Sequence, residues 1–285
     1  MCDDDEDYGD CPIWFRKSIF YSPPFILAFL ATATYRSILM TNTLYWDEKP
    51  LIAKITLFSY HYFLLLYFIT LYKSVFTDPG NAKRAVSRFD IENYFVEEKR
   101  FCKYCQIFKP ERTHHCSHCK MCILKMDHHC PWVSNCIGFY NQKYFILFLF
   151  YSLLLTITIS IIVFMSFITR TEENKQDIQI KNCYGTFFDF LLALLFVAFS
   201  LPFLYTNGRR VLKNVTVIEE IKSRNEEELK KYDLGIIENM KQTLGTNYFL
   251  WFFPTYKSVE GDGFFFKQSN KISINEKNLK EIKII

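Results

Sequence analysis

Four stretches of this chain are long and apolar enough to cross a lipid bilayer as helices. They cover residues 18–40, 51–76, 144–168 and 186–206, and about 20 helical residues suffice to cross a hydrocarbon core of ~30 Å. Half of all residues are hydrophobic, yet the mean hydropathy is close to zero, so polar regions must be sizeable. We expect a mostly α-helical membrane protein built on a bundle of four transmembrane helices.

Basic residues set the expected orientation of these helices. They gather before the first apolar stretch, after the second and after the fourth, while the two opposite loops are poorer in them. Cytoplasmic loops carry an excess of Lys and Arg, so we expect both termini and the loop between spans two and three to be cytosolic. The residues concerned are Arg16, Lys17, Lys83, Arg84, Arg88, Arg209, Arg210 and Lys213.

This topology divides the chain into five regions. Residues 1–17 form a cytosolic tail, 18–76 hold the first two spans, 77–143 form a cytosolic loop, 144–206 hold the last two spans, and 207–285 form a cytosolic C-terminal region. Seven of the ten cysteines lie in the loop 77–143. Because the cytosol is reducing, metal binding or catalysis explains them better than disulfides do.

The cysteine-rich loop repeats itself at an offset of 14 residues. Each copy reads Cys-x2-Cys-x9-His-x6-Cys, and three thiolates with one imidazole suit tetrahedral zinc. The expected result is two interleaved structural zinc sites, formed by Cys102, Cys105, His115 and Cys122 and by Cys116, Cys119, His129 and Cys136.

A second partition of these ligands stays open. It groups the four thiolates of Cys102, Cys105, Cys116 and Cys119 around one ion and leaves the remaining ligands for the other. In either partition a short loop without its own apolar core depends on metal to fold, because zinc contributes on the order of 10 kcal/mol.

One cysteine of the loop is left over once both metal sites are filled. Cys130 ends the run Asp127-His128-His129-Cys130. A free thiol is only a few per cent thiolate at neutral pH, and an adjacent base raises that fraction. We predict that Cys130 is a nucleophile, that His128 is its base, and that Asp127 fixes the tautomer of His128. The alternatives are a buried structural thiol, or one that binds metal loosely or senses oxidants.

These residues resemble the cysteine-rich domain of the DHHC palmitoyltransferases. The family pattern Cys-x2-Cys-x9-His-Cys-x2-Cys-x2-Cys-x4-Asp-His-His-Cys-x5-Cys-x4-Asn-x3-Phe matches at every named position, through Asn141 and Phe145. The resemblance runs from the first span to about Phe266. It implies a zinc-bound domain of short β-hairpins between spans two and three of a four-span bundle.

The same resemblance implies a two-step reaction. Cys130 is acylated by palmitoyl-CoA or another long-chain acyl-CoA, and it then passes the acyl group to a cysteine of a substrate protein. The enzyme thus acylates itself first, while the two zinc ions hold the loop and do not touch the substrate.

Further motifs of the family recur, with one departure. Asp78-Pro79-Gly80 matches its Asp-Pro-Gly, although a turn that stops a helix explains these residues equally well. Its Thr-Thr-x-Glu appears as Thr216-Val217-Ile218-Glu219, so a hydrogen bond from the second hydroxyl is in doubt. Asn239 is implied to be a structural hydrogen-bonding partner. The aromatic stretch 245–254 resembles the C-terminal element of the family, and by itself it is typical of an interfacial anchor.

The resemblance also implies where acyl-CoA binds. It places the acyl chain among the spans above Cys130, with Trp132, Phe145 and Phe148 at the mouth and Leu155 deeper in the third span. A leucine at that depth is expected to admit chains longer than palmitate, which use of C14 and shorter chains alone would contradict. Cationic side chains suit the CoA phosphates, and the candidates are Lys109, Arg112 and His114, with a solvated basic face as the alternative.

The expected partners follow from this chemistry. They are long-chain acyl-CoA, the bilayer, substrate proteins with membrane-proximal cysteines and, as a further candidate, an accessory subunit. The family favours an endomembrane such as the Golgi or the endoplasmic reticulum.

Three other classes of function are less well supported. A net charge of +4 without a basic and aromatic run excludes nucleic-acid binding. A four-span transporter is disfavoured because no span carries charged interior pairs. A zinc-stabilised scaffold without chemistry is the stronger competitor, but the intact residues Asp127, His128 and Cys130 favour an enzyme.

Overall fold

The computed structural model describes residues 50–89, 100–172, 179–255 and 261–269. Its three long helices are α3 (Pro50–Phe76), α5 (Gln142–Glu172) and α6 (Gln179–Lys213). Each contains a segment long and apolar enough to cross a membrane. They match the predicted spans at 51–76, 144–168 and 186–206, and the expected span at 18–40 lies outside the described residues. The prediction of a mostly helical fold is confirmed.

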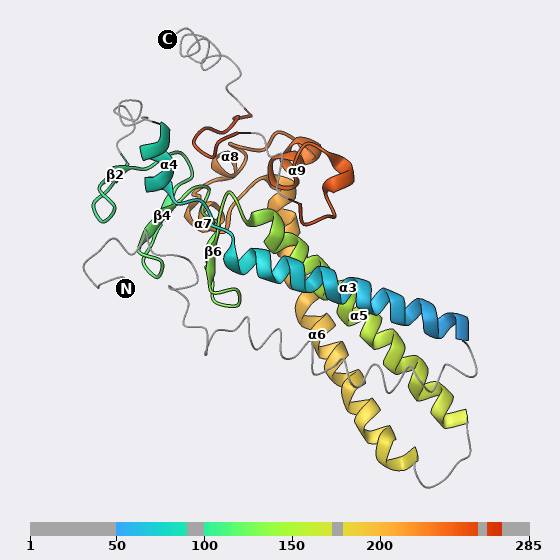
Figure 1. The fold of residues 1–285 in the computed structure, drawn as a ribbon. Helices are drawn as coiled ribbons and strands as arrows, with labels where there is room; N and C mark the ends of the chain where they lie inside the picture. The colour runs from blue at the N-terminus through green and yellow to red at the C-terminus, as the bar shows by residue number, and fades with distance from the viewer. Residues whose placement is uncertain (1–49, 90–99, 173–178, 256–260, 270–285) are drawn as a thin grey trace.

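The three long helices form an elongated bundle (Figure 1), in which α3 and α6 both pack along α5. The short strands and small helices gather at one end of this bundle. Large apolar side chains such as Phe58 and Leu195 are exposed on its flanks. An exposed apolar flank fits contact with lipid tails, so the composition of the helices agrees with their length.

Helix α6 is longer than the sequence indicated. A proline near the end of a span usually kinks or stops the helix, and Pro202 does not stop this one, because it lies inside a helix that continues to Lys213. Proline removes one backbone hydrogen bond, a loss that spanning helices tolerate when neighbouring groups satisfy the freed carbonyl. The continuous helix carries the chain directly to Asn214 and the C-terminal elements.

The cysteine-rich region consists of three antiparallel hairpins. They pair β1 (Phe101–Cys102) with β2 (Ile107–Phe108), β3 (His114–Cys116) with β4 (Met121–Ile123), and β5 (His128–Cys130) with β6 (Asn135–Ile137). Strands this short are not stable alone in water. The expected short β-hairpins are confirmed, and their stability must come from crosslinks and from packing on other elements.

The 14-residue repeat extends to the third hairpin. Cys102 pairs with Ile107, Cys116 with Met121, and Cys130 with Asn135. Each turn also holds a residue with positive φ at the same offset, namely Gln106 (55°), Lys120 (52°) and Ser134 (48°). The hairpin that carries Cys130 is therefore a third copy of the unit that supplies the metal ligands.

Asn135 fastens the third hairpin to the end of α3. Its Nδ2 donates to the carbonyl oxygens of Ser74, Val75 and Thr77 at 3.2, 3.2 and 3.0 Å. Carbonyls at a helix C-terminus have no partner within the helix. Because Asn135 is only 3% exposed and faces Cys130 across the hairpin, this capping fixes the hairpin at the end of the span.

The Asp-Pro-Gly motif forms the turn that follows α3. Asp78 Oδ1 accepts from the amides of Gly80 and Asn81 at 2.8 and 3.0 Å, and helix α4 (Ala82–Phe89) begins directly afterwards. The Leu124 amide donates to the Gly80 carbonyl at 2.9 Å. These contacts agree with the turn interpretation and join the second hairpin to the same helix end.

After α6 the described residues form four short helices: α7 (Val217–Lys222), α8 (Glu226–Leu229), α9 (Ile236–Leu244) and the 3-10 helix η3 (Tyr248–Leu250). Asn239 is fully buried and donates from Nδ2 to the Leu212 carbonyl at 2.7 Å, which ties α9 to the end of α6.

The aromatic stretch is held by polar side chains of the spans. Lys143 Nζ donates to the Leu250 carbonyl at 2.8 Å, and the Tyr151 hydroxyl donates to the Phe252 carbonyl. Phe249 is 89% exposed. The stretch therefore lies at the same end of the bundle as the hairpins, a position that suits an interfacial anchor.

The close approach at Gly138 gives a test of this packing. A Cβ there would lie 2.5 Å from Ile123 Cγ2 and 2.6 Å from the Pro79 carbonyl oxygen. Overpacking of this kind costs about 1–3 kcal/mol, so we expect Gly138→Ala to lower the unfolding temperature in detergent. The matched control is Gly208→Ala, where nothing lies within 4 Å and helix propensity favours alanine by about 0.5–1 kcal/mol. Equal behaviour of the two variants would contradict this packing.

Candidate metal and thiol site

Two clusters of three cysteines and one histidine lie between successive hairpins. In each cluster the four donor atoms lie within 4.8 Å of one another, and the members are Cys102, Cys105, His115 and Cys122, and Cys116, Cys119, His129 and Cys136. The two cysteines of one hairpin face the histidine and cysteine of the next. The geometry favours the interleaved partition over the four-thiolate one.

The donor spacing in these clusters fits tetrahedral zinc. The sulfurs of Cys102, Cys105 and Cys122 lie 3.7, 3.3 and 3.9 Å from His115 Nδ1. Bond lengths of about 2.3 Å for sulfur and 2.0–2.1 Å for nitrogen give an S···N edge of about 3.6 Å in a tetrahedron. Zinc bound here would crosslink the hairpins. Three thiolates also give each filled site a net charge of −1.

Cys130 belongs to neither cluster. Its residue is 1% exposed, and it packs in an apolar cluster with Val133, Phe145 and Phe148 at the end of the spans. From the sequence, Cys130 is the cysteine left over once both metal sites are filled. The geometry agrees, because within the described chain the sulfur of Cys130 has no set of metal ligands around it.

Asp127 and His128 stand next to this thiol. His128 Nδ1 and Asp127 Oδ2 are 2.6 Å apart, and Cys130 is close enough to the imidazole to influence its pKa. Burial disfavours the charged imidazole, but the hydrogen bonds and negative charges of Asp127 and Cys130 outweigh it and raise the pKa of His128 to about 9. Carboxylate, imidazole and thiol are the group types that form an orienter, base and nucleophile set.

Helix α7 holds the other oxygen of Asp127. The Val217 amide donates to Asp127 Oδ1 at 3.0 Å. Thr216 caps the helix: its hydroxyl accepts from the Glu219 amide at 3.2 Å, while its own amide donates to Glu219 Oε2 at 2.8 Å. The missing hydroxyl at Val217 therefore leaves this contact intact, because the backbone makes it.

Arg112 anchors α7 to the hairpins. Its Nε and Nη2 donate to Glu219 Oε1 and Oε2 at 2.6 and 2.7 Å, and Nη1 donates to Asn214 Oδ1 at 3.1 Å. Burial works against ionisation of Glu219, yet the Arg112 guanidinium outweighs it and lowers the pKa of that carboxyl. Since Arg112 is only 3% exposed, its donors are engaged inside the protein.

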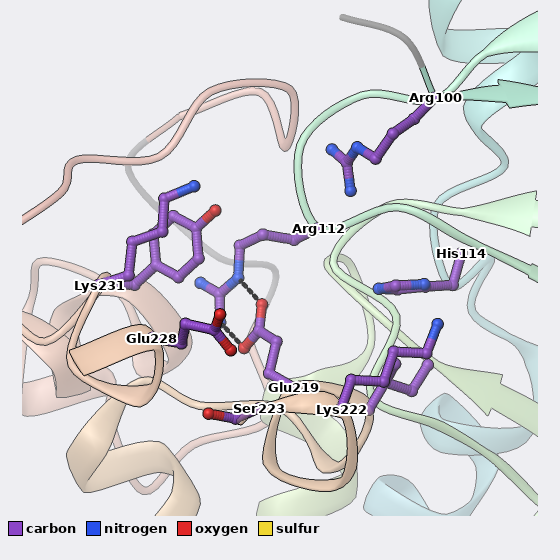
Figure 2. A pocket seen from close by; sticks show the side chains of 10 residues that line it. Arg100, Arg112, His114, Glu219, Lys222, Ser223, Glu228 and Lys231 are labelled. Carbon is purple, nitrogen blue, oxygen red and sulfur yellow. Dashed lines mark hydrogen bonds and ion pairs between the residues drawn. The ribbon is translucent and has the colours of Figure 1, made fainter. Parts of the chain in front are cut away.

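A basic pocket lies beside this ion pair (Figure 2). It has a volume of about 210 Å³, and its lining includes Arg100, His114, Lys222 and Lys231 around the Arg112–Glu219 pair. Burial, together with the charges of Lys222 and Arg100, lowers the pKa of His114 to about 4. The cations that lower this pKa are Arg100 and Lys109, at either end of the first hairpin, and Lys222 of α7.

The predicted acyl-binding residues fall in two places. Phe145, Phe148 and Leu155 belong to the buried cluster that includes Cys130, and the Phe145 ring lies 5.3 Å from the His128 ring, centroid to centroid. Trp132 is 45% exposed and faces Phe199 of α6 at 6.5 Å.

Of the predicted CoA-binding residues, Arg112 and His114 line the pocket. Lys109 does not line it, but its charge contributes to the lowered pKa of His114.

Sequence reasoning missed three contributors to this site. Asn135 caps α3. The sequence signal for it is a polar residue at the repeat position that Ile107 and Met121 occupy in the other two hairpins, both of them buried. Lys125 is 2% exposed; burial and Arg112 lower its pKa to about 7 against the opposing charges of Glu219 and Asp127. The Val217 amide carries no signal in the sequence, because any residue but proline supplies it.

Comparisons with known proteins agree with this site. The sequence pattern of the DHHC palmitoyltransferase family matches residues 96–224. The chain is 30% identical to palmitoyltransferase ZDHHC20 of Bos taurus, covering 89% of this chain and 78% of that protein. It is 32% identical to palmitoyltransferase ZDHHC15 of Rattus norvegicus, with coverage of 87% and 82%, and 33% identical to probable protein S-acyltransferase 14 of Arabidopsis thaliana, with 78% and 80%.

Bundle, paired metal clusters and buried thiol together describe a membrane-embedded acyltransferase. The chain belongs to the DHHC palmitoyltransferase family. Its activity is that of a protein palmitoyltransferase, as the resemblance in the sequence predicted.

The pairing of His128 with Asp127 predicts a pH-dependent stability. A pKa of about 9, above the ordinary value of about 6.5, means that the folded state binds this proton more tightly than the unfolded state. The stabilisation is complete below about pH 6.5 and is lost as the pH rises through about 9. We expect Asp127→Asn to lower the unfolding temperature most near pH 6.5 and least near pH 10.

The control for this measurement is Asp262→Asn, which changes a carboxylate on an exposed loop. It should show no such trend. A difference between wild type and Asp127→Asn that stays constant from pH 6.5 to pH 10 would refute the charged pair.

Proposed function

We propose that Cys130 is the residue of this palmitoyltransferase that carries the acyl group. The observation that supports it best is a buried thiol that lies beside the Asp127–His128 pair and packs among apolar side chains of the spans. A thiol in that position meets a polar proton acceptor on one side and a lipid-like environment on the other. An acyl thioester needs both.

The first step transfers the acyl group to the enzyme. The Cys130 sulfur, after giving its proton to His128, attacks the thioester carbonyl carbon of acyl-CoA. The new sulfur–acyl bond forms as the bond to the CoA sulfur breaks, and the CoA thiolate leaves with the proton from His128. Asp127 keeps Nδ1 of His128 protonated, so that the other ring nitrogen faces the thiol.

The second step transfers the acyl group from Cys130 to the substrate protein by the same kind of thioester exchange. The thiol of a substrate cysteine gives its proton to His128 and attacks the acyl carbonyl carbon on Cys130. The bond to Cys130 breaks, and its sulfur recovers the proton. The zinc ions take no part in either step in this scheme; the eight ligands hold the hairpins, and zinc supplies the crosslinks.

We propose the four-span topology with both termini and the site in the cytosol. Under this proposal the regions are 1–17, 18–76, 77–143, 144–206 and 207–285, as the sequence indicated. The basic residues after α3 and at the end of α6 support it, because they lie at the end of the bundle that carries the hairpins. Acyl-CoA, substrate proteins with membrane-proximal cysteines and an endomembrane location belong to the same proposal.

The acyl chain is proposed to lie among α3, α5 and α6. Phe145 and Phe148 belong to the same buried cluster as the thiol, and so does Leu155, which lies about two turns further along α5 than Phe148. The half-exposed Trp132, between the hairpin and α6, is placed to cover the mouth. Leucine at position 155 leaves room for chains longer than palmitate.

The CoA headgroup is proposed to bind in the basic pocket. Arg100, Lys222 and Lys231 present cations there, and phosphate oxygens are the natural partners of such groups. An anion beside His114 would also favour its protonation, which burial and the surrounding cations now oppose. Arg112 serves this pocket as a support, because its own donors are bound to Glu219 and Asn214.

The carrier role predicts a covalent intermediate on Cys130. Incubation of the purified protein with labelled palmitoyl-CoA should give a hydroxylamine-sensitive label on this residue, and Cys130→Ser should abolish both the label and transfer to protein. The control is a variant of a cysteine outside the loop, Cys183→Ser, which should keep the label. Label that persists in Cys130→Ser would falsify the proposal. So would a wild-type protein that takes no label, which is the behaviour expected of a scaffold without chemistry.

The pocket predicts a charge effect on KM. Lys222→Glu should raise the KM for palmitoyl-CoA roughly tenfold, equivalent to about 1.4 kcal/mol, with little change in kcat. The KM for palmitoyl-N-acetylcysteamine, a thioester without the nucleotide, should stay constant. Lys213→Glu, at the end of α6 outside the pocket, is the matched control. Equal weakening for both thioesters in Lys222→Glu would place the headgroup elsewhere.

A further inference from the structure

The hairpin of Cys130 has the backbone of a metal-binding turn. Cys102, Cys116 and Cys130 occupy the same register position in three successive hairpins, and each hairpin turns through a left-handed residue four positions later. In the second hairpin the Cys119 amide donates to Cys116 Sγ at 3.4 Å. Such a turn aims a sulfur and nearby amides at one point, as a thiolate ligand requires.

The third hairpin lacks the second thiolate of this turn. The repeat places Cys105 and Cys119 three residues after the first cysteine, and the equivalent residue here is Val133. Val133 is fully buried and packs in the same apolar cluster as Cys130. The valine therefore occupies the place of the sulfur that would complete a Cys-x2-Cys pair.

The other half of a metal site is also replaced. Each cluster takes its histidine and last cysteine from the following hairpin, but after the third hairpin the chain enters α5. The positions 14 residues beyond His129 and Cys136 are Lys143 and Phe150, neither of which suits zinc. The imidazole beside Cys130 that belongs to neither cluster in the described part of the chain is that of His128, whose Nδ1 lies 2.6 Å from Asp127 Oδ2.

We propose that this hairpin is a third metal-binding turn, and that Val133 keeps soft divalent cations such as Zn²⁺ off the thiol of Cys130. Cys130 and His128 form a two-donor half-site, and one further thiolate at position 133 would make it a chelate. The consequence for catalysis rests on the proposed role of Cys130 as acyl carrier. The geometric inference stands apart from that role, because it concerns only where donor atoms lie.

The test is Val133→Cys in the full-length protein in detergent. We expect the metal content with added Zn²⁺ to rise from two to three equivalents per chain, and Cd²⁺ to give additional sulfur-to-metal charge-transfer absorbance. Self-acylation should fall more than tenfold with one added equivalent of Zn²⁺ and return with a mild chelator that leaves two ions bound. The metal content is measured independently of activity. If Cys130 is not the acyl carrier, wild type takes no acyl label, and that result is recognised separately from the metal content of Val133→Cys.

Two controls make the outcome specific. Val133→Ser introduces a side chain close in size to cysteine but without a thiolate, and it should hold two equivalents of metal per chain. The double variant Cys130→Ser/Val133→Cys should also hold two equivalents, against three for Val133→Cys. A Val133→Cys protein that keeps its two ions but takes no third in excess Cd²⁺ overturns the proposal.

If Val133→Cys loses a structural ion, wild type and Cys130→Ser are compared in excess Cd²⁺. Because the proposal keeps metal off Cys130 while Val133 is present, the two proteins should give the same spectrum. A sulfur–cadmium band that is present in wild type and missing from Cys130→Ser would overturn the proposal.

Discussion

Metal ligation between successive hairpins is the constraint on which the geometry of this site depends. The strands are two or three residues long, too short to hold together in water, and each cluster joins the turn of one hairpin to the strands of the next. With both crosslinks formed, the third hairpin has a fixed position relative to the first two. The residues Asp127, His128 and Cys130 lie on or beside that third hairpin. Under the proposed function, residues that take no part in the chemistry would therefore determine where the Cys130 sulfur stands.

Much of this arrangement can be predicted from the sequence, because the metal ligands recur at a fixed spacing and the spans are recognised by the length of their apolar stretches. The offset of 14 residues identified all eight ligands, and the same arithmetic isolated Cys130. Hydropathy located three helices that the structure describes. It did not show that α6 continues past Pro202 to Lys213, because the sequence does not reveal which neighbours satisfy the carbonyl that a proline frees. The sequence also gave no reason to treat Arg112 as a buried anchor: a lone arginine on a loop looks like a surface cation until Glu219 and Asn214 are brought to it.

The link between α7 and Asp127 was hidden for a different reason. Val217 contributes only its amide, so side-chain chemistry at that position is nearly irrelevant to the contact, whereas the helix that presents the amide depends on Thr216 and Glu219. A motif that appears degraded by a Thr-to-Val difference thus retains its geometry. Arg112 and Glu219 are about 100 residues apart in sequence. Their pairing connects the helix that orients the Asp127 carboxylate to the wall of the basic pocket.

The three carbonyl contacts of Asn135 tie the last residues of α3 to the hairpin that carries Cys130. A spanning helix shifts along the membrane normal only at a cost, because the shift exposes apolar or polar groups to the wrong medium. If Cys130 carries the acyl group as proposed, its sulfur would stand at a nearly constant depth, and acceptor proteins would be sorted by how far their own chains can reach toward the bilayer. Sequences tethered at the same distance from the lipid would then be equivalent, so that anchoring geometry, and not a consensus of flanking residues, would govern the choice of substrates under this proposal.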